Sequence, residues 1–264
     1  MKKGISNHTR CLAYRTKAAA VAVLTLAAGI AVQSCDDGDD DQFASFPLNR
    51  PNAIVTVKPS PDGNSFSMQL DDSTRATATN MAAAPYGAKE VRALTNYRTL
   101  TQTDNGHNYL VYVNWLDSIR TKDMAESLGA TTNSERYKED PVELLRDWTV
   151  SEDGYLTIHF RTLWVPTGVP HTVNLAQTDV SNPYDLTFYH DAQGVKGGYW
   201  GDGIVAFRLD RLPDTNGRTV DMTLHWLSFG GKRSITFKYS THRGTANIDG
   251  LSFAQSGQFE RAVR

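Results

Sequence analysis

The chain has 264 residues, with 27 Lys and Arg, 29 Asp and Glu, and a formal net charge of −2 at pH 7. Proteins gain affinity for nucleic acids mainly from Lys and Arg side chains on phosphates, so this balance disfavours a nucleic-acid partner. Two cysteines are too few for a disulfide framework, which leaves folding to a hydrophobic core. The length suffices for one large or two modest domains.

The first 34 residues have the pattern of a secretory leader. Five basic residues and no acidic residue precede position 18, and an apolar run of about 15 residues follows, shorter than the about 20 that a transmembrane helix needs. Cys35 comes directly after the small residue Ser34, where a bacterial lipoprotein would be cleaved and lipidated. We expect residues 1–34 to be a lipoprotein signal peptide and Cys35 to anchor the chain to a membrane outside the cytoplasm. The alternative is an ordinary signal peptide with a chance cysteine.

Residues 35–50 are expected to form an acidic tether. Five aspartates lie within 36–41, without the spacing or the closing Glu of a calcium loop, so a flexible charged spacer is the favoured interpretation. Loss of the five basic residues of the leader moves the formal net charge to about −7. The leader also holds Cys11, so the mature chain keeps only Cys35 and no disulfide is expected.

Residues 51–120 predict a small β-barrel. Alternating apolar residues mark strands over 53–58 and 66–70 around an Asp62-Gly63 turn, which is typical of a hairpin. Further strands are expected over 90–98 and 108–116, with a turn at 104–106, and the stretch 73–88 is expected to be looser. Four or five strands in about 70 residues, rich in β-branched and aromatic types, suit a small barrel.

Residues 121–147 are expected to be a polar linker with a short helix. The stretch 123–129 is one candidate for this helix. At 140–145, Asp140 can cap a helix, Pro141 suits its first position and Glu143 completes a capping box. One or two helical turns are therefore predicted there.

Residues 148–242 return to a β pattern. Leu156, Ile158 and Phe160 alternate with a polar set, which comprises Tyr155, Thr157, His159 and Arg161. Further strands are expected over 171–176, 184–190, 204–210, 220–227 and 234–239. Short strands separated by regular Asp-Gly and Asn-Gly turns predict an antiparallel β-sandwich whose sheets are covered on one side only. Residues 243–264 are expected to be a poorly ordered tail.

Several collinear segments together carry a family resemblance. They are 69–73 (QLDDS), 89–94 (KEVRAL), 113–119 (VNWLDSI), 140–148 (DPVELLRDW), 153–164 (DGYLTIHFRTLW), 201–209 (GDGIVAFRL), 212–215 (LPDT) and 226–237. Over about residues 50–240 the chain resembles the NigD-like lipoproteins of Bacteroidetes. The resemblance implies an all-β protein, with an OB-like barrel over 51–120 followed by a β-sandwich over 148–242, which agrees with the strand pattern.

The resemblance implies no defined chemistry. The family has no established biochemical activity, and its name comes from the gene neighbourhood of a bacteriocin, which makes immunity an association. Acidic residues directly after the lipidated cysteine of such lipoproteins resemble an export tag to the outer face of the outer membrane. We therefore expect a lipid-anchored envelope protein, most simply at the outer membrane and exposed at the surface.

The residues that carry chemistry elsewhere form no pattern typical of a catalytic or metal site. The histidines of the mature chain lack H-x-x-x-H or H-x-H spacing, and His159 and His225 are expected to be solvated on polar strand faces. No G-x-S-x-G occurs, and Ser228-Phe229-Gly230-Gly231 is typical of a hairpin turn. A triad from distant residues stays open because geometry defines it. The carboxylates available to a glycosidase (Asp71, Asp72, Asp117, Asp202, Asp210) form no recognisable pair. We expect no enzyme activity, cofactor or metal.

A glycine-rich segment over 194–203 is the one speculative ligand-facing feature. It has five glycines without the strand-to-helix context of a phosphate loop. It could present Tyr199 and Trp200 for stacking on sugar rings. The favoured alternative is that Trp200 covers the end of the core, because large aromatic side chains usually bury most of their area.

Three functions follow from these observations. The first is a non-catalytic binding or accessory lipoprotein for an envelope protein or a glycan. The second is a bacteriocin immunity or toxin-sequestering lipoprotein. The third is a cryptic hydrolase of surface glycans.

Overall fold

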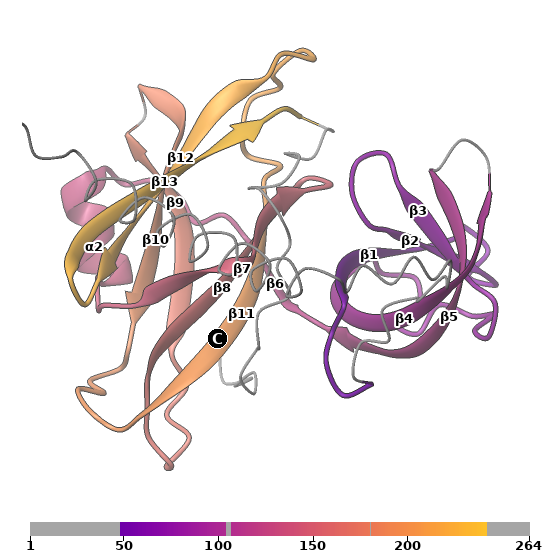
Figure 1. The fold of residues 1–264 in the computed structure, drawn as a ribbon. Helices are drawn as coiled ribbons and strands as arrows, with labels where there is room; N and C mark the ends of the chain where they lie inside the picture. The colour runs from indigo at the N-terminus through magenta and orange to yellow at the C-terminus, as the bar shows by residue number, and fades with distance from the viewer. Residues whose placement is uncertain (1–47, 104–106, 180, 242–264) are drawn as a thin grey trace, which may run out of the picture. The chain divides into compact units, whose positions relative to one another are not determined.

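The computed structural model describes residues 48–103, 107–179 and 181–241, which all belong to the compact unit Phe46–Arg264 (Figure 1). The predictions for the signal peptide, Cys35, the acidic run, the 104–106 turn and the 243–264 tail lie outside the described residues. Over the described ranges, no helix has the length and apolar character that a membrane crossing requires. The elements are almost all strands, as the sequence predicts.

The first half of the described chain is a closed barrel. Its strands are β1 (Ala53–Pro59), β2 (Phe66–Gln69), β3 (Arg75–Ala78), β4 (Val91–Thr103) and β5 (Asn108–Ser118), in the order β1-β2-β3-β5-β4. Alternate residues of these strands fill the interior with Val55, Val57, Phe66, Met68, Ala76, Ala93, Val111 and Val113. The stretch predicted to be loose contains β3, which pairs in parallel with β5 and closes the barrel.

The second half is a sandwich of two four-stranded sheets. One sheet has the order β6-β11-β8-β7, with β6 (Arg120–Asp123), β7 (Glu143–Glu152), β8 (Tyr155–Trp164) and β11 (Tyr199–Arg208). The other has the order β13-β12-β10-β9, with β9 (Thr172–Asp179), β10 (Asn182–Asp191), β12 (Val220–Ser228) and β13 (Gly231–Tyr239). Most pairs are antiparallel, but β6–β11 and β10–β12 are parallel. The fold class is confirmed as a small barrel followed by a β-sandwich.

The core of the sandwich follows the alternation of the sequence. Leu156, Ile158 and Phe160 of β8 are buried against Met222 and Leu224 of β12. Because side chains of a strand alternate between its two faces, these residues fix which residues of each strand point away from the core. On β11 the core face carries Val205 and Phe207, and the outer face carries Trp200, Asp202, Ile204 and Ala206.

The helix predictions were wrong in position. The helix in the described ranges is α2 (Ala130–Tyr137), and 140–145 forms no helix because β7 begins at Glu143 and pairs with β8. Asp140 instead accepts a hydrogen bond from the backbone N–H of Ala192 at 2.8 Å. Sheet hydrogen bonds to a distant strand therefore override the local capping signal, and β6 and the first part of β7 lie in the stretch expected to be a linker.

The prediction of a solvated polar face on β8 was also wrong. Thr157 and His159 are buried, the latter with 2 % of its surface exposed. β8 lies between β7 and β11, and its outer face is covered by barrel residues at one end. Alternation shows which residues share a face, but it does not show whether another part of the chain covers that face.

Candidate functional site

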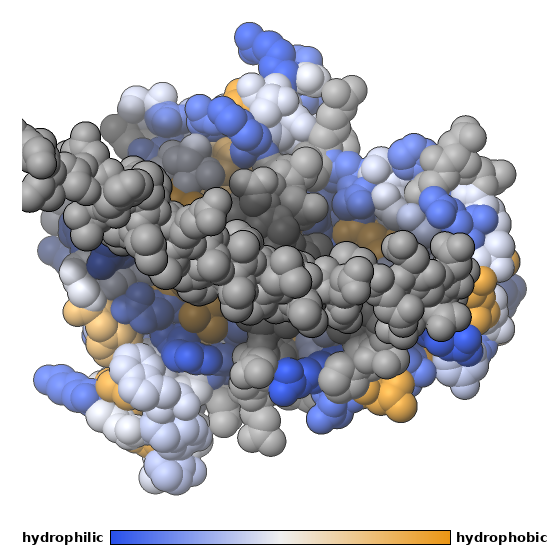
Figure 2. Space-filling model, viewed as in Figure 1, coloured by the Kyte–Doolittle hydropathy of each residue, from blue (hydrophilic) through white to orange (hydrophobic). Residues whose placement is uncertain are grey.

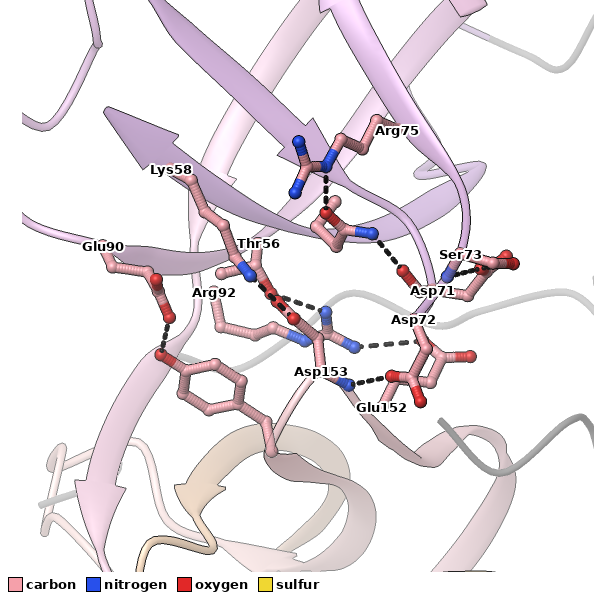
Figure 3. A network of polar contacts seen from close by, with 12 residues as sticks. Thr56, Lys58, Asp71, Asp72, Ser73, Arg75, Glu90, Arg92, Glu152 and Asp153 are labelled. Carbon is pink, nitrogen blue, oxygen red and sulfur yellow. Dashed lines mark hydrogen bonds and ion pairs between the residues drawn. The ribbon is translucent and has the colours of Figure 1, made fainter. Parts of the chain in front are cut away.

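A buried charged network joins barrel strands to the turn between β7 and β8 (Figure 3). The Arg92 side chain on β4 has no exposed surface, and its guanidinium binds Glu152 at 3.1 Å and donates to Thr56 Oγ1 at 3.0 Å. Lys58 pairs with Asp153 at 2.7 Å, and Asp72 accepts a hydrogen bond from the Asp153 backbone N–H at 3.0 Å. Burial raises the pKa of Glu152 to about 7, although the neighbouring Arg92 opposes the shift.

Apolar residues surround this network. Ile54, Leu94 and Ile119 from the barrel side form one cluster with Trp148, Tyr155 and Ala206 from the sandwich. The Tyr155 hydroxyl donates to the Glu90 carboxylate at 2.7 Å. Because Arg92 is enclosed and each of its three guanidinium nitrogens has a partner within the chain, it is a structural contact between strands and is not accessible to a ligand.

A polar hollow of about 370 Å³ lies next to this network. It is lined by Lys58, Gln69, Asp72, Ser73, Arg75, His107, Asn108 and Asp153. Its groups largely bind one another, as in the Lys58–Asp153 ion pair and the Arg75 Nε donation to Gln69 Oε1 at 2.9 Å. A ligand would have to replace these contacts, so the hollow is a weak candidate.

A second hollow of about 300 Å³ lies beside α2 on the β13-β12-β10-β9 sheet. The Thr178 and Thr187 hydroxyls on its floor lie 2.8 Å apart, and His225 at its edge pairs with Asp185 at 2.7 Å. His225 is only partly buried, in line with its prediction as a sheet residue near solvent. Several polar groups of this hollow bind within the chain, among them Ser134 to Glu139 at 2.8 Å, whereas the buried Nε1 of Trp226 has no hydrogen-bond partner among the described residues.

The buried histidines have structural surroundings. His171 Nδ1 lies 2.9 Å from His190 Nε2, and Trp164 stacks on the His171 ring at 4.2 Å. Burial lowers the pKa of His190 to about 4, so both rings are neutral near pH 7. Within the described ranges, no group of three or more His, Cys, Asp and Glu side chains has a geometry that could hold a metal ion.

Two exposed aromatic side chains form what we call the aromatic surface: Trp200 at the start of β11 and Phe229 in the β12–β13 turn. Their exposed fractions are 55 % and 43 %, and their ring centroids lie 4.9 Å apart at an interplanar angle of 68°. The structure therefore contradicts the expectation that Trp200 covers the end of the core. Tyr199 is also exposed, but adjacent strand residues point to opposite faces, so it does not share this surface.

Two glycines fix the position of the strand that carries Trp200. A Cβ atom on Gly203 would lie 2.5 Å from the Phe160 ring, and one on Gly198 would collide with the Trp164 carbonyl oxygen. Only glycine lets β11 pack this closely against β8. Part of the glycine-rich segment thus has a packing role, and Trp200 lies on a regular strand rather than on a free loop.

Three charged residues form a row beside the aromatic surface, which we call the polar row: Glu143, Arg161 and Asp202. Arg161 lies opposite Glu143 on β7 and opposite Asp202 on β11, so all three point away from the core. The Arg161 guanidinium binds both carboxylate oxygens of Asp202, with Nη2 at 3.0 Å from Oδ2. This hydrogen bonding raises the pKa of Arg161.

The polar row is also joined to the neighbouring groups. His159 Nε2 lies 3.4 Å from Asp202, and its Nδ1 lies 2.8 Å from the Asp147 carbonyl oxygen. Glu143 accepts a hydrogen bond from the Phe229 backbone N–H at 3.1 Å. The carboxylate of Asp202 and the turn that bears Phe229 are therefore both held in place.

Sequence reasoning found part of this site and missed the rest. It singled out Trp200, and it predicted the 228–231 turn correctly. It did not identify Phe229 or the polar row, because their contacts join segments that are far apart in the chain. An aromatic residue at the tip of a tight glycine turn, where no core is within reach, is the signal that would have found Phe229.

Two family models match the chain. The NigD-like N-terminal OB domain matches residues 54–119, and the NigD-like C-terminal beta sandwich domain matches residues 124–239. Both matches fall on the barrel and the sandwich described above. A comparison with curated proteins finds no similar sequence.

Solved structures of several bacterial proteins share the fold. A protein from Parabacteroides distasonis whose name relates it to toxins is 35 % identical, with a TM-score of 0.60, over 72 % of this chain and 92 % of its own. A protein of unknown function from Bacteroides vulgatus is 19 % identical, with a TM-score of 0.58, over 74 % and 95 %. A NigD-like immunity protein from Bacteroides caccae is 23 % identical, with a TM-score of 0.52, over 71 % and 96 %. The last two show the fold alone.

Proposed function

We propose that this chain, which belongs to the NigD-like family, is a non-catalytic binding module of the cell envelope that contacts its partner through the aromatic surface. The partner is an envelope glycan or an envelope protein. The observation that carries the proposal is the exposure of Trp200 and Phe229 beside a fixed row of charged groups.

Exposure of these two rings has no structural benefit. Full burial of a large apolar side chain stabilises a protein by about 1.5–3 kcal/mol, and much of that contribution is absent here. Exposed aromatic residues that touch one another are typical of recognition surfaces, because they supply large, rigid contact area. In contrast, Arg92 and His190 are enclosed, which supports a non-catalytic role for these titratable groups of the interior.

The leader supports attachment to the envelope. Residues 1–34 combine a basic start with a short apolar run, and Cys35 follows them directly. A lipoprotein with several acyl chains binds a membrane firmly, whereas a single chain binds only marginally. The acidic run after Cys35 supports the outer membrane, and its outer face, as the location.

The test is capture of partners from intact native cells by crosslinking of the full lipoprotein, with identification of proteins and glycans by mass spectrometry. We expect a dominant partner whose recovery drops at least tenfold with the double variant Trp200→Ala/Phe229→Ala. Tyr112→Ala is the matched control, because Tyr112 is a similarly exposed aromatic residue on the barrel. Equal recovery with the double variant and the control would refute the aromatic surface as the contact.

Attachment is tested separately by cell fractionation. Cys35→Ser is expected to move the protein from the membrane fraction to the soluble fraction. Retention of the variant in the membrane fraction would contradict a lipid on Cys35.

Bacteriocin immunity is the second candidate function. It is favoured by the name of the similar Parabacteroides distasonis protein, which relates that protein to toxins. In this role the chain would bind a toxin at the surface. A strain that lacks the gene would become sensitive to toxins encoded nearby, and unchanged sensitivity would remove this function.

A further inference from the structure

We infer that the aromatic surface and the polar row together form a binding site for a neutral pyranose sugar. A sugar ring would stack on Trp200, and its hydroxyl groups would hydrogen bond to Arg161 and Glu143, while the buried Asp202 holds the Arg161 guanidinium in place. This inference rests on the proposed function and names the ligand class of the same site.

The geometry of the two rings leaves room for stacking. At an interplanar angle of 68° the edge of one ring meets the face of the other. In such a pair, the ring that offers its edge has neither face in contact with its partner. The other ring is contacted on one face only, so its second face is free of the partner ring. The face of an aromatic ring carries partial negative charge, which attracts the polarised C–H groups on the apolar face of a pyranose.

The polar row has the hydrogen-bonding groups that the rim of a sugar ring requires. Each sugar hydroxyl can donate one hydrogen bond and accept others, so it pairs well with carboxylates and guanidinium groups. Arg161 uses Nε and Nη2 on Asp202, which leaves three of its five N–H donors for a ligand. Its side chain is partly exposed, whereas Asp202 is buried and fixed.

The spacing suits one sugar ring and its substituents. Trp200 and Asp202 lie two residues apart on the same face of β11, a separation of about 7 Å along the strand. Glu143, Arg161 and Asp202 lie on three adjacent strands, which spans about 10 Å across the sheet. A ring stacked on Trp200 therefore places its hydroxyl rim near the polar row.

Charge favours a neutral ligand. Asp202 offsets the charge of Arg161, and Glu143 adds a negative charge to the row. A uronic acid would bring a further carboxylate toward these two acidic groups, which like-charge repulsion disfavours. We therefore place uncharged hexoses, deoxyhexoses and N-acetylhexosamines ahead of acidic sugars.

A protein partner fits these residues less well. Protein interfaces bury about 800 Å² on each side, and their energetic centre is an apolar pocket from which water is excluded. Here only two rings are clustered, and charged groups lie directly beside them. A protein surface would desolvate those charges at a cost unless it matched them, whereas sugar hydroxyls can satisfy them. Where the surface in Figure 2 is not grey, hydrophobic residues occur in small separate groups among hydrophilic ones.

The test is isothermal titration of the purified full lipoprotein in detergent with defined polysaccharides. The neutral probes are α-mannan, a β-glucan, a fucose-containing polysaccharide and an N-acetylglucosamine oligomer, and polygalacturonate is the acidic comparator. We expect binding to at least one neutral probe and at least tenfold weaker binding to polygalacturonate. Trp200→Ala is expected to weaken the neutral interaction at least tenfold, and Tyr112→Ala is expected to leave it unchanged.

The role of the polar row needs a variant that keeps the fold. Arg161→Ala would leave the buried Asp202 carboxylate without its main partner, so Arg161→Lys is the better test, because it keeps the charge and loses the planar fork. We expect Arg161→Lys to weaken sugar binding severalfold, with the unfolding temperature close to that of the wild type. A variant with an equal unfolding temperature and full sugar binding would exclude the row from the site.

The outcomes separate this inference from the proposed function. No binding to any neutral probe, or binding that Trp200→Ala leaves intact, overturns the sugar site. If capture from cells still depends on Trp200 in that case, the partner is a protein and the proposed function stands. If capture from cells does not depend on Trp200 either, both the sugar site and the proposed contact through the aromatic surface are refuted.

Discussion

The outer face of the β6-β11-β8-β7 sheet has two regions with opposite character. At one end Tyr155 and Ala206 pack against barrel residues, and the fully buried Arg92 reaches Glu152 (Figure 3). At the other end Trp200 is more than half exposed beside the polar row. The same β11 strand thus runs from a covered region with buried charge to an open region with exposed aromatic side chains.

This contrast shows that residue type alone does not separate a structural contact from a candidate binding surface. At the covered end, Arg92 has no exposed side-chain surface, Glu152 has little, and the two bind each other, so their contribution is to stability. The rings at the open end contribute little to the core, so selection for stability does not account for them. Accessibility and the identity of hydrogen-bond partners separate the two cases.

The largest expected effect is at the covered end. Arg92→Ala should lower the free energy of unfolding by about 3–5 kcal/mol, because it leaves the Glu152 carboxylate buried without its partner. Denaturant unfolding followed by circular dichroism measures this change. The double variant Arg92→Ala/Glu152→Gln should recover part of the lost stability. A loss below about 1 kcal/mol for Arg92→Ala alone would show that the ion pair behaves like a solvent-exposed one.

The pH dependence of the same pair gives the next effect. Burial raises the pKa of Glu152 from 4.5 to about 7, so between these values the folded protein holds a proton that the unfolded chain releases. The raised pKa of Glu152 therefore stabilises the fold fully below pH 4.5, and this stabilisation is lost as the pH rises through 7. The free energy of unfolding falls by at most about 3 kcal/mol from this cause. Buried histidines such as His190 act in the opposite direction, because their pKa values are lowered.

The comparison that isolates Glu152 is the difference in unfolding free energy between the wild type and Glu152→Gln, measured from pH 4.5 to 7.5. As the pH rises, the wild type should lose unfolding free energy relative to Glu152→Gln. A difference that does not change with pH would mean that Glu152 has an ordinary pKa in the folded protein.

A smaller effect is expected where β11 passes from one region to the other. Gly203→Ala places a methyl group against the Phe160 ring, and overpacking of this kind costs about 1–3 kcal/mol. Gly197→Ala is the matched control, because no atom lies within 4 Å of the position that its Cβ would take and its φ is unstrained. Equal thermal stability of the two variants would contradict the close approach of β11 to β8.

The smallest effect on stability is expected at the open end. Trp200→Ala should lower the free energy of unfolding by about 1–2 kcal/mol, since it loses one edge-to-face contact with Phe229 and the less than half of its surface that is buried. A loss of about 3 kcal/mol in thermal or denaturant unfolding would instead identify Trp200 as a core residue. The comparison between the two ends would then no longer hold.

The sequence predicts the fold well where a pattern is set by local alternation. Leu156, Ile158 and Phe160, which alternate with polar residues in the sequence, lie in the core, and the Asp153-Gly154 and 228–231 turns join paired strands. The capping box at Asp140 led to a wrong helix prediction. The segment pairs as strand β7 with β8 instead, because the sheet hydrogen bonds outweigh the capping interaction. His159 was misplaced because its ring binds groups on the two neighbouring strands, Asp147 on β7 and Asp202 on β11, which alternation within β8 does not reveal.

The candidate site was harder to predict for the same reason. Trp200 is marked by its glycine-rich surroundings, but its contact with Phe229 joins two strand ends separated by the whole β11–β12 segment. The polar row needs the register of β7, β8 and β11, which alternation within one strand does not determine. Contacts between the two sheets, and between strands that are far apart in the chain, therefore cannot be predicted from local sequence patterns.

The most direct test of the open end as a binding surface is photocrosslinking in intact native cells. A photoreactive phenylalanine analogue replaces Trp200 in the full lipoprotein, and a second protein carries it at Tyr112 on the barrel. The account predicts a specific crosslinked product from position 200 that is absent from position 112. Identical products from both positions, or none from position 200, would contradict it.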